Sequence, residues 1–190
     1  MWIGRSTALR GLLAASAAAG LTVAIAGGSP ASAEDNAQAV APAKTISMRS
    51  AGGFRFTGST QVTRGQTLRI RNLADVREGG PHTFTLVASN VLPKSRKAMK
   101  DCFTPGKVCM FAGIAHEFNE QTMAVGKPLV EAGQPGWDKR FSRTVKTGDS
   151  WYSEKKGEVS ERIVSARAGT LLRYMCVVHP EMQGKIKVVG

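Results

Sequence analysis

The C-terminal segment Tyr174–Gly184 constrains this chain more than any other part of the sequence. It places the thiol of Cys176, the imidazole of His179 and the thioether of Met182 at intervals of three residues. A second imidazole, that of His82, lies 94 positions before the cysteine. Two imidazoles, one thiolate and a weakly bound thioether form the donor set of a blue-copper electron-transfer site. To use these donors together, the chain has to fold His82 against its C-terminal segment.

The way this segment continues resembles the cupredoxin family, specifically its amicyanin, pseudoazurin and plastocyanin-like branch. As in that family, the Cys-x2-His-x2-Met spacing leads through Gly184 into an alternating run, Lys185–Val189. The close match covers Pro81–Leu86 and Gly169–Gly190, while Lys44–Leu73 matches in pattern alone. The resemblance implies a β-sandwich in which the first histidine lies on a strand and the other ligands lie on a loop between the last two strands.

The resemblance also implies a role for each donor. His82, Cys176 and His179 would bind one type 1 copper ion in a plane, and Met182 would be the axial ligand. Core packing is the alternative role for Met182, because methionine commonly fills gaps in cores. Family members usually carry asparagine after the first histidine, which ties the two ligand segments together. Here the hydroxyl of Thr83 is expected to make that tie.

In the resembled family the second histidine lies at the surface within a ring of apolar side chains, where electrons leave. For His179 we expect this ring to come from Pro81, Val178 and Pro180. Proline has no N–H group and restricted backbone torsions, so Pro180 should also stiffen the short ligand loop.

The apolar pattern around the first histidine predicts that its side chain faces the core. In the run His82–Val87, Phe84 and Leu86 are in phase with His82, and alternate side chains of a strand share a face. Cys176 likewise shares a face with the apolar residues two and four positions before it. A buried histidine that is fully hydrogen-bonded and binds no metal is the alternative for His82.

Further alternating runs, separated by turn signals, predict short strands along the chain. They are Thr45–Met48, Phe54–Phe56, Thr67–Arg71, Glu161–Val164, Leu171–Cys176 and Lys185–Val189. Short strands without a long helical pattern indicate an all-β fold, a Greek-key β-sandwich. We expect one such domain over residues 44–190.

Between the two ligand segments, the alternation fades from Val91 to Lys146. The separation between His82 and Cys176 exceeds that in minimal family members, so we predict an insertion at about residues 91–146. Apolar residues at helical spacing predict a short helix within Phe111–Val125. His116 is expected to be a surface or capping residue of that helix.

The N-terminus carries the features of a secretory signal peptide. Arg5 and Arg10 precede the apolar, alanine-rich stretch Gly11–Gly27, and Ala31-Ser32-Ala33 is a small-residue cleavage site. We predict a signal peptide at residues 1–33 and a flexible linker at 34–43; an uncleaved anchor is the alternative. No other stretch reaches the roughly 18 apolar residues of a membrane helix, so we expect no transmembrane segment after cleavage. The expected location is secreted, periplasmic or in the cell envelope.

Two further cysteines, Cys102 and Cys109, flank a short loop with Pro105-Gly106 at its centre. In an exported chain such a pair favours a disulfide. The alternative is a second metal site formed by both cysteines and His116, which would lack a fourth ligand and the usual Cys-x2-Cys spacing.

The chain is strongly basic, with a formal net charge of +12. Cleavage after Ala33 would remove Arg5 and Arg10 and leave +10. Such a surface favours an acidic redox protein, an anionic wall polymer or anionic lipid headgroups. The basic residues are spread rather than concentrated on one helix, so we expect no nucleic-acid partner, and we expect a monomer.

These patterns predict a secreted one-electron carrier with one type 1 copper ion. The alternative is an envelope copper-binding or copper-delivery protein without a dedicated electron-transfer role. Delivery proteins typically expose Met- or His-rich clusters, whereas the methionines here are scattered. We do not expect an enzyme such as a multicopper oxidase, because only His116 remains after His82 and His179 are assigned.

Overall fold

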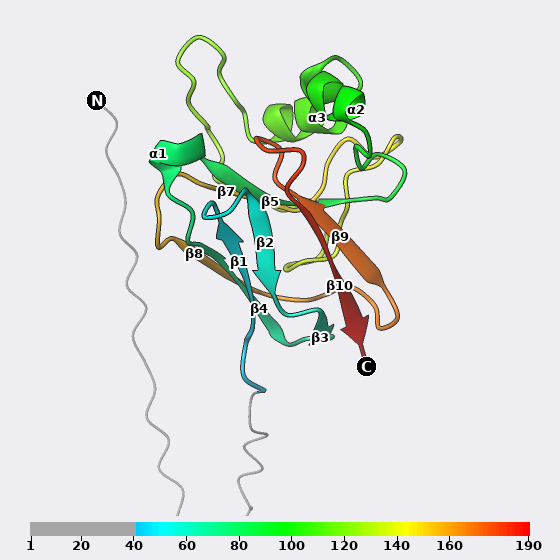
Figure 1. The fold of residues 1–190 in the computed structure, drawn as a ribbon. Helices are drawn as coiled ribbons and strands as arrows, with labels where there is room; N and C mark the ends of the chain where they lie inside the picture. The colour runs from blue at the N-terminus through cyan, green and yellow to red at the C-terminus, as the bar shows by residue number, and fades with distance from the viewer. Residues whose placement is uncertain (1–40) are drawn as a thin grey trace, which may run out of the picture. The chain divides into compact units, whose positions relative to one another are not determined.

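The computed structural model describes residues 41–190 (Figure 1). The predicted signal peptide and most of the predicted linker lie outside these residues. The strands are β1 (Lys44–Arg49), β2 (Arg55–Gly58), β3 (Gln61–Thr63), β4 (Thr67–Asn72), β5 (His82–Val87), β6 (Leu129–Val130), β7 (Ser150–Ser153), β8 (Val159–Ile163), β9 (Leu171–Met175) and β10 (Gln183–Val189). The helices are α1 (Val76–Gly79), α2 (Arg96–Lys100), the 3-10 helix η1 (Asp101–Phe103) and α3 (Val108–Ala115). None of these helices combines the length and apolar character needed to span a membrane.

The strands form two sheets. One sheet has the order β2-β1-β4-β8 and the other the order β3-β10-β9-β5-β7-β6. Both are mixed, because β1 runs parallel to β4 and β10 runs parallel to β3. In the larger sheet β5 pairs with β9 on one side and β7 on the other, so the strand that begins at His82 lies beside the strand that leads to Cys176. The two sheets confirm the predicted β-sandwich.

The main core lies between the two sheets. Its members alternate along their strands, as expected for side chains that point to opposite faces in turn. They include Ile46, Met48, Leu68, Ile70, Phe84, Leu86, Leu172, Tyr174, Ile186 and Val188. Burial of one such large side chain contributes roughly 1.5–3 kcal/mol, so this cluster is the principal source of stability. Cys176 and Met182 belong to the same cluster.

The predicted strands are all present, and β5 has the predicted bounds. The sequence reading missed the short strands β3, β6 and β7 and the single-turn helix α1. The sequence of strand β7 has no polar–apolar alternation that would reveal it, although the strand pairs with both β5 and β6. Three of its four residues are buried, because Trp151 packs in the main core while Ser150, on the other face, contacts His116 of the insertion. Burial on both faces removes the alternation that would reveal the strand.

The segment between the ligand strands holds two short α-helices and a 3-10 helix. Helix α2 begins after Ser95, whose hydroxyl accepts a hydrogen bond from the N–H of Ala98 at 3.1 Å. The predicted helix exists as α3, but it begins three residues earlier than predicted and ends at Ala115. The backbone at Glu117 (φ 53°) and Met123 (φ 55°) is left-handed, which is incompatible with a continued helix.

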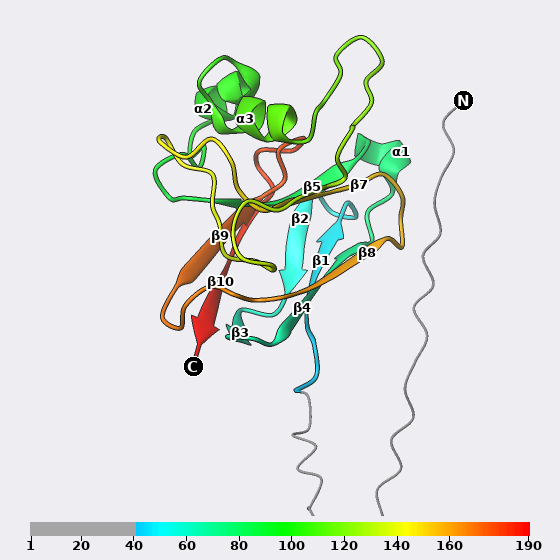
Figure 2. The same ribbon diagram turned by 180° about the vertical axis from the view of Figure 1, so that it is seen from behind.

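A disulfide between Cys102 and Cys109 closes this helical unit, as predicted, with the two Cα atoms 5.1 Å apart. Both cysteines pack in a second buried cluster with Phe141, Met175 and Val177. The insertion therefore covers the face of the ligand segment opposite to the main core. In both views α3 lies next to the loop between β9 and β10 (Figures 1 and 2).

Candidate metal centre

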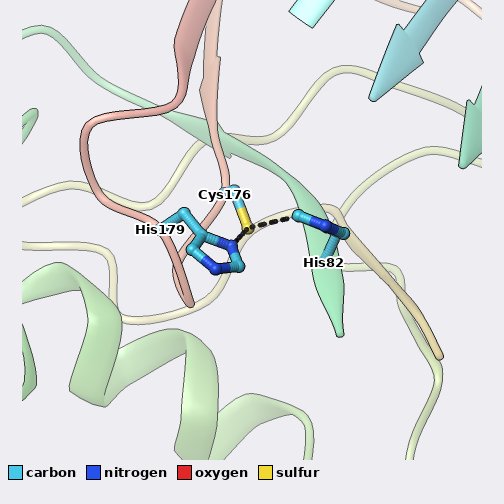
Figure 3. Close-up of side chains that lie close together, drawn as sticks. All are labelled: His82, Cys176 and His179. Carbon is cyan, nitrogen blue, oxygen red and sulfur yellow. Dashed lines mark hydrogen bonds between the residues drawn. The ribbon is translucent and has the colours of Figure 1, made fainter. Parts of the chain in front are cut away.

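The fold brings three of the predicted ligands together at one end of the sandwich. His82 begins β5, while Cys176 and His179 lie on the loop between β9 and β10 (Figure 3). One donor atom from each of the three residues lies within 4.8 Å of the others, and all three side chains are buried. Nδ1 of His82 is 3.8 Å from the sulfur of Cys176, and Nδ1 of His179 is 3.6 Å from it.

These distances fit a single metal ion. An ion such as Zn²⁺ binds nitrogen and sulfur donors at about 2.0–2.3 Å, so donors arranged in a plane around it lie roughly 3.6–3.8 Å apart. Both imidazoles turn Nδ1 toward the sulfur, which leaves Nε2 as the protonated nitrogen of each ring. The donor set of thiol and imidazoles suits copper.

Burial keeps all three groups neutral when no cation is bound. It raises the pKa of the Cys176 thiol. Burial, with repulsion from His179, lowers the pKa of His82 to about 4, and burial lowers the pKa of His179. Neutral imidazoles are the form that binds metal, and a bound cation favours the thiolate over the thiol. Without a metal ion the three groups therefore do not form a thiolate–imidazolium ion pair, and the thiolate is expected only when a cation is bound.

The surroundings of His82 exclude the alternative of a fully hydrogen-bonded core histidine. Its Nε2 is buried and has no hydrogen-bond partner in the described part of the chain. An unpaired buried N–H group costs about 1–3 kcal/mol. A histidine retained only for packing would not leave one nitrogen unpaired and turn the other toward a thiol.

Two hydrogen bonds join β5 to the ligand loop at Thr83. Its N–H donates to the sulfur of Cys176 at 3.2 Å, and its hydroxyl accepts from the N–H of Val177 at 2.9 Å. The hydroxyl thus makes the tie that was expected of it. Hydrogen bonding around the cysteine sulfur is one of the factors that set the potential of a blue-copper site.

Met182, the predicted axial ligand, is joined to the other ligand residues of the loop through its backbone. The N–H of Cys176 donates to the carbonyl of Met182 at 2.9 Å, and the N–H of Met182 donates to the carbonyl of His179 at 2.8 Å. The Met182 side chain is fully buried in the main core. Axial ligation by Met182 stays a prediction, since core packing accounts for the same burial.

His179 is the ligand nearest the surface, with 9% of its area exposed. The expected neighbours Pro81, Val178 and Pro180 are all half-buried. The sequence reading missed Phe54, whose ring stacks on His179 with centroids 4.0 Å apart. It also missed Gly79, where a Cβ atom would lie 3.0 Å from Nε2 of His179 and closer still to Phe54. No spacing or motif signals either contact, because both depend on how β2 and α1 fold over the loop.

The remaining histidine does not join this cluster. His116 is 2% exposed, so its expected surface position is wrong, although it does cap the C-terminus of α3. Its Nδ1 is hydrogen-bonded to the carbonyl of Lys127 and its Nε2 lies 2.7 Å from the hydroxyl of Ser150. The alternative second metal site is also excluded, since its two cysteines form the disulfide.

Comparisons with known proteins give distant structural similarities. No protein-family model matches the sequence, and no curated protein matches it. A purple cupredoxin from Nitrosopumilus maritimus is 13% identical, with 76% of this chain and 97% of that chain covered and a TM-score of 0.39. Auracyanin B is 16% identical, with 77% and 88% covered and a TM-score of 0.41. A multicopper oxidase from Pediococcus acidilactici is 13% identical, with 77% and 26% covered and a TM-score of 0.35.

Similarities at this level carry no argument of their own, so the assignment depends on the strand order and side chains of this chain. The two mixed sheets place β5 beside β9. The loop after β9 then brings the sulfur of Cys176 and the imidazole of His179 next to the imidazole of His82, all three buried. Residues 41–190 thus have a cupredoxin-like fold, and His82, Cys176, His179 and Met182 form a set typical of a type 1 copper site.

Proposed function

We propose that this chain is a type 1 copper protein that carries single electrons between redox partners. The observation that carries the proposal is the buried triangle of Cys176 with His82 and His179, whose Nδ1 atoms lie 3.8 and 3.6 Å from the sulfur. When bound there, copper supplies a one-electron redox couple. The residues of this chain hold the donors in place and keep water from them.

The rigidity of the donors favours rapid electron transfer. Cys176 is held by the N–H of Thr83 and by its own N–H bond to Met182, and His179 is held under Phe54. Since the donors already have their binding arrangement, a change of oxidation state requires little movement of the protein. Prepositioned groups of this kind avoid a reorganisation cost at the moment of reaction.

His179 is the proposed exit for electrons. It reaches the surface among the half-buried apolar side chains of Pro81, Val178 and Pro180. A partner that packs against this apolar rim would approach the site without a layer of ordered water between them. Cys176, in contrast, is fully buried and cannot meet a partner directly.

The charge distribution favours an acidic redox protein as partner. Around α2 the exposed basic residues are Lys94, Arg96, Lys97, Lys100 and Lys107. The one acidic residue in that stretch, Asp101, is paired with Lys97 at 2.6 Å. Gln183 links this region to the ligand loop, because its Nε2 donates to the carbonyls of Pro93 and Pro180, both at 2.7 Å. Long-range attraction to an acidic partner would speed association and weaken with salt.

We propose no enzymatic role, on the basis of the histidine count, and an exported protein, on the basis of the predicted signal peptide. The sequence contains three histidines, and both ring nitrogens of His116 are engaged in hydrogen bonds. No histidine is left for the additional copper centres of an oxidase.

Copper retention during redox cycling separates the carrier from a copper-delivery protein. The copper-loaded protein is reduced and reoxidised repeatedly in the presence of a strong Cu(I) chelator, while its visible absorption is followed. A carrier is expected to exchange one electron per copper and to recover its full absorption at each reoxidation, because Cys176 is fully buried. Release of copper to the chelator in each reduced phase would contradict the carrier function and support delivery.

A further inference from the structure

A continuous chain of hydrogen bonds leads from the helical insertion to the ligand loop. Nε2 of His116 lies 2.7 Å from Oγ of Ser150, which lies 2.7 Å from Oγ1 of Thr85. Thr85 donates to Oγ1 of Thr83 at 3.0 Å, and Thr83 Oγ1 also accepts from the N–H of Val177 at 2.9 Å. We call these side chains, His116, Ser150, Thr85 and Thr83, the relay. All four are buried, with exposures of 2% or less.

The relay lies on the opposite face of β5 from the metal ligand. Thr83 and Thr85 alternate with His82 and Phe84 along this strand, so their hydroxyls point away from the main core. Ser150 comes from β7, which pairs with β5 in a register that places Thr85 opposite Ser150. Thr83 connects the two faces, because its N–H contacts the Cys176 sulfur while its hydroxyl belongs to the relay.

The number of protons in the relay depends on the charge of His116. Each hydroxyl can donate one proton. Since Thr85 donates to Thr83, the proton between Ser150 and Thr85 must come from Ser150, and His116 must then donate to Ser150 through Nε2. Its Nδ1 faces the carbonyl of Lys127, which only accepts. With Thr85 donating to Thr83, the relay therefore requires both N–H groups of a protonated imidazole.

Loss of a proton from His116 rearranges this chain. Nδ1 keeps its proton for the Lys127 carbonyl, and Nε2 becomes an acceptor for the Ser150 hydroxyl. Ser150 then receives the proton of Thr85, and the donation from Thr85 to Thr83 is lost. The oxygen of Thr83 that holds the Val177 N–H then accepts only this one hydrogen bond, and its own hydroxyl proton turns to donate to Thr85.

We propose that His116, Ser150 and Thr85 are positioning residues for the ligand loop, and that proton binding at His116 is coupled through them to the reduction potential of the metal centre. The part that concerns the potential depends on the proposed function, whereas the coupling between His116 and the loop does not. A proton gained at His116 adds positive charge and favours the reduced, less positive centre, so the potential is expected to rise as the pH falls.

The groups around His116 lower the pH at which its ring binds a proton to below that of a free imidazole. Burial lowers the pKa of His116, and the hydrogen bond to Lys127 opposes that shift. The nearby charges of Glu117 and Lys127 are paired with each other. The ring of Tyr152 lies 6.2 Å from His116, and burial and neighbouring carboxylates raise its pKa to about 12, so it stays neutral. No carboxylate contacts the His116 ring within residues 41–190.

The first test uses the metal-free protein and NMR. The pH titration of the His116 ring and of the Val177 amide is followed in wild type and in Ser150→Ala, which keeps His116 but breaks the relay. We expect the Val177 amide of wild type to show an inflection at the His116 transition, and this inflection to disappear in Ser150→Ala while those caused by His82 and His179 remain. A Val177 inflection unchanged in Ser150→Ala would overturn the relay, whether or not the protein binds copper.

The second test measures the reduction potential of the copper-loaded protein against pH. Wild type is expected to show a step that is absent in His116→Gln and smaller in Ser150→Ala and Thr85→Val, which keep the charge of His116 but break the relay. A tenfold difference in His116 proton affinity between the two oxidation states corresponds to about 59 mV. Ser165→Ala is the matched control, because it removes a buried hydroxyl that has no hydrogen-bond partner, and it should keep the full step. A step of unchanged size in Ser150→Ala and Thr85→Val would overturn the coupling through the relay.

Discussion

The ligand end of the sandwich and the helical insertion each bury a histidine, but the two ring systems have different surroundings. His82 is fully buried, with one nitrogen facing a thiol and the other without a partner. His116 is 2% exposed, and both of its nitrogens are hydrogen-bonded. Burial lowers the pKa of both. Both histidines are buried and both have a lowered pKa, so these properties do not separate them. The unpaired ring nitrogen of His82 is what distinguishes this candidate ligand from His116, whose two ring nitrogens are both hydrogen-bonded.

The largest expected effect tests this distinction directly. His82→Gln should lose the intense copper absorption and weaken copper binding by more than about 100-fold, a loss larger than outer-shell changes usually cause. His116→Gln is the comparison variant: as a change outside the ligand set it should keep the absorption and lose no more than the roughly 10–100-fold in affinity that outer-shell changes cause. Copper titrations of the two variants, followed by visible absorption, provide the measurement. Equal losses in both variants would show that the comparison is wrong.

Acid should destabilise the metal-free protein. His82 has a pKa of about 4 in the folded state and an ordinary value of 6.5 when unfolded, so below pH 6.5 the unfolded chain binds more protons. At about 1.4 kcal/mol per pKa unit, His82 removes about 3 kcal/mol between pH 6.5 and pH 4. His116 and His179 have shifts of the same direction. Denaturant unfolding at several pH values should show a smaller loss in His82→Gln than in wild type; an identical loss would contradict the assigned shift.

Removal of the disulfide should affect the insertion more than the metal site. Replacement of Cys102 and Cys109 by serine releases a short loop, for which the chain-entropy model gives a loss of about 2–3 kcal/mol. Denaturant unfolding measures the loss of stability, and the copper absorption reports on the site. Because both cysteines pack against Met175 and Val177, a small spectral change is expected, but complete loss of the copper absorption would show that the site depends on the insertion.

The smallest effect is expected from substitution of Met182, the predicted axial ligand. Met182→Gln should leave copper bound and lower the reduction potential, because an amide oxygen is a harder donor than a thioether and favours the oxidised ion. Met175→Leu is the matched control, since Met175 is as fully buried as Met182 but packs in the second cluster. Voltammetry of both variants gives the potentials. An unchanged potential in Met182→Gln would assign Met182 to core packing alone.

The sequence predicted the parts of the fold that have a local pattern. The alternation in His82–Val87 predicted both the bounds of β5 and the inward direction of His82, because successive side chains of a strand point to opposite faces. The ligand loop was implied by the resemblance of the segment Cys176–Gly184 to cupredoxins, which place three ligands on a loop between the last two strands. The disulfide was predicted from two cysteines that flank a turn.

The contacts that the sequence did not reveal are those made between distant segments. Phe54 reaches His179 only because β2 folds over the loop, and no motif marks this contact. His116 was expected to be a surface or capping residue; it does cap α3, but its burial was missed because the groups that bind its ring lie on distant segments, at Lys127 and Ser150. A polar residue on a short helix is normally exposed, and only the tertiary structure supplies the two hydrogen bonds that allow its burial.

The most direct test of the central claim is the visible and EPR spectrum of the protein loaded with one equivalent of Cu(II). The arrangement of Cys176 between two imidazoles predicts an intense thiolate-to-copper absorption in the red and a narrow copper hyperfine splitting, both lost in Cys176→Ala. A weak absorption with an ordinary wide splitting would show that the thiolate does not bind the ion, and would contradict both the type 1 site and the electron-carrier function.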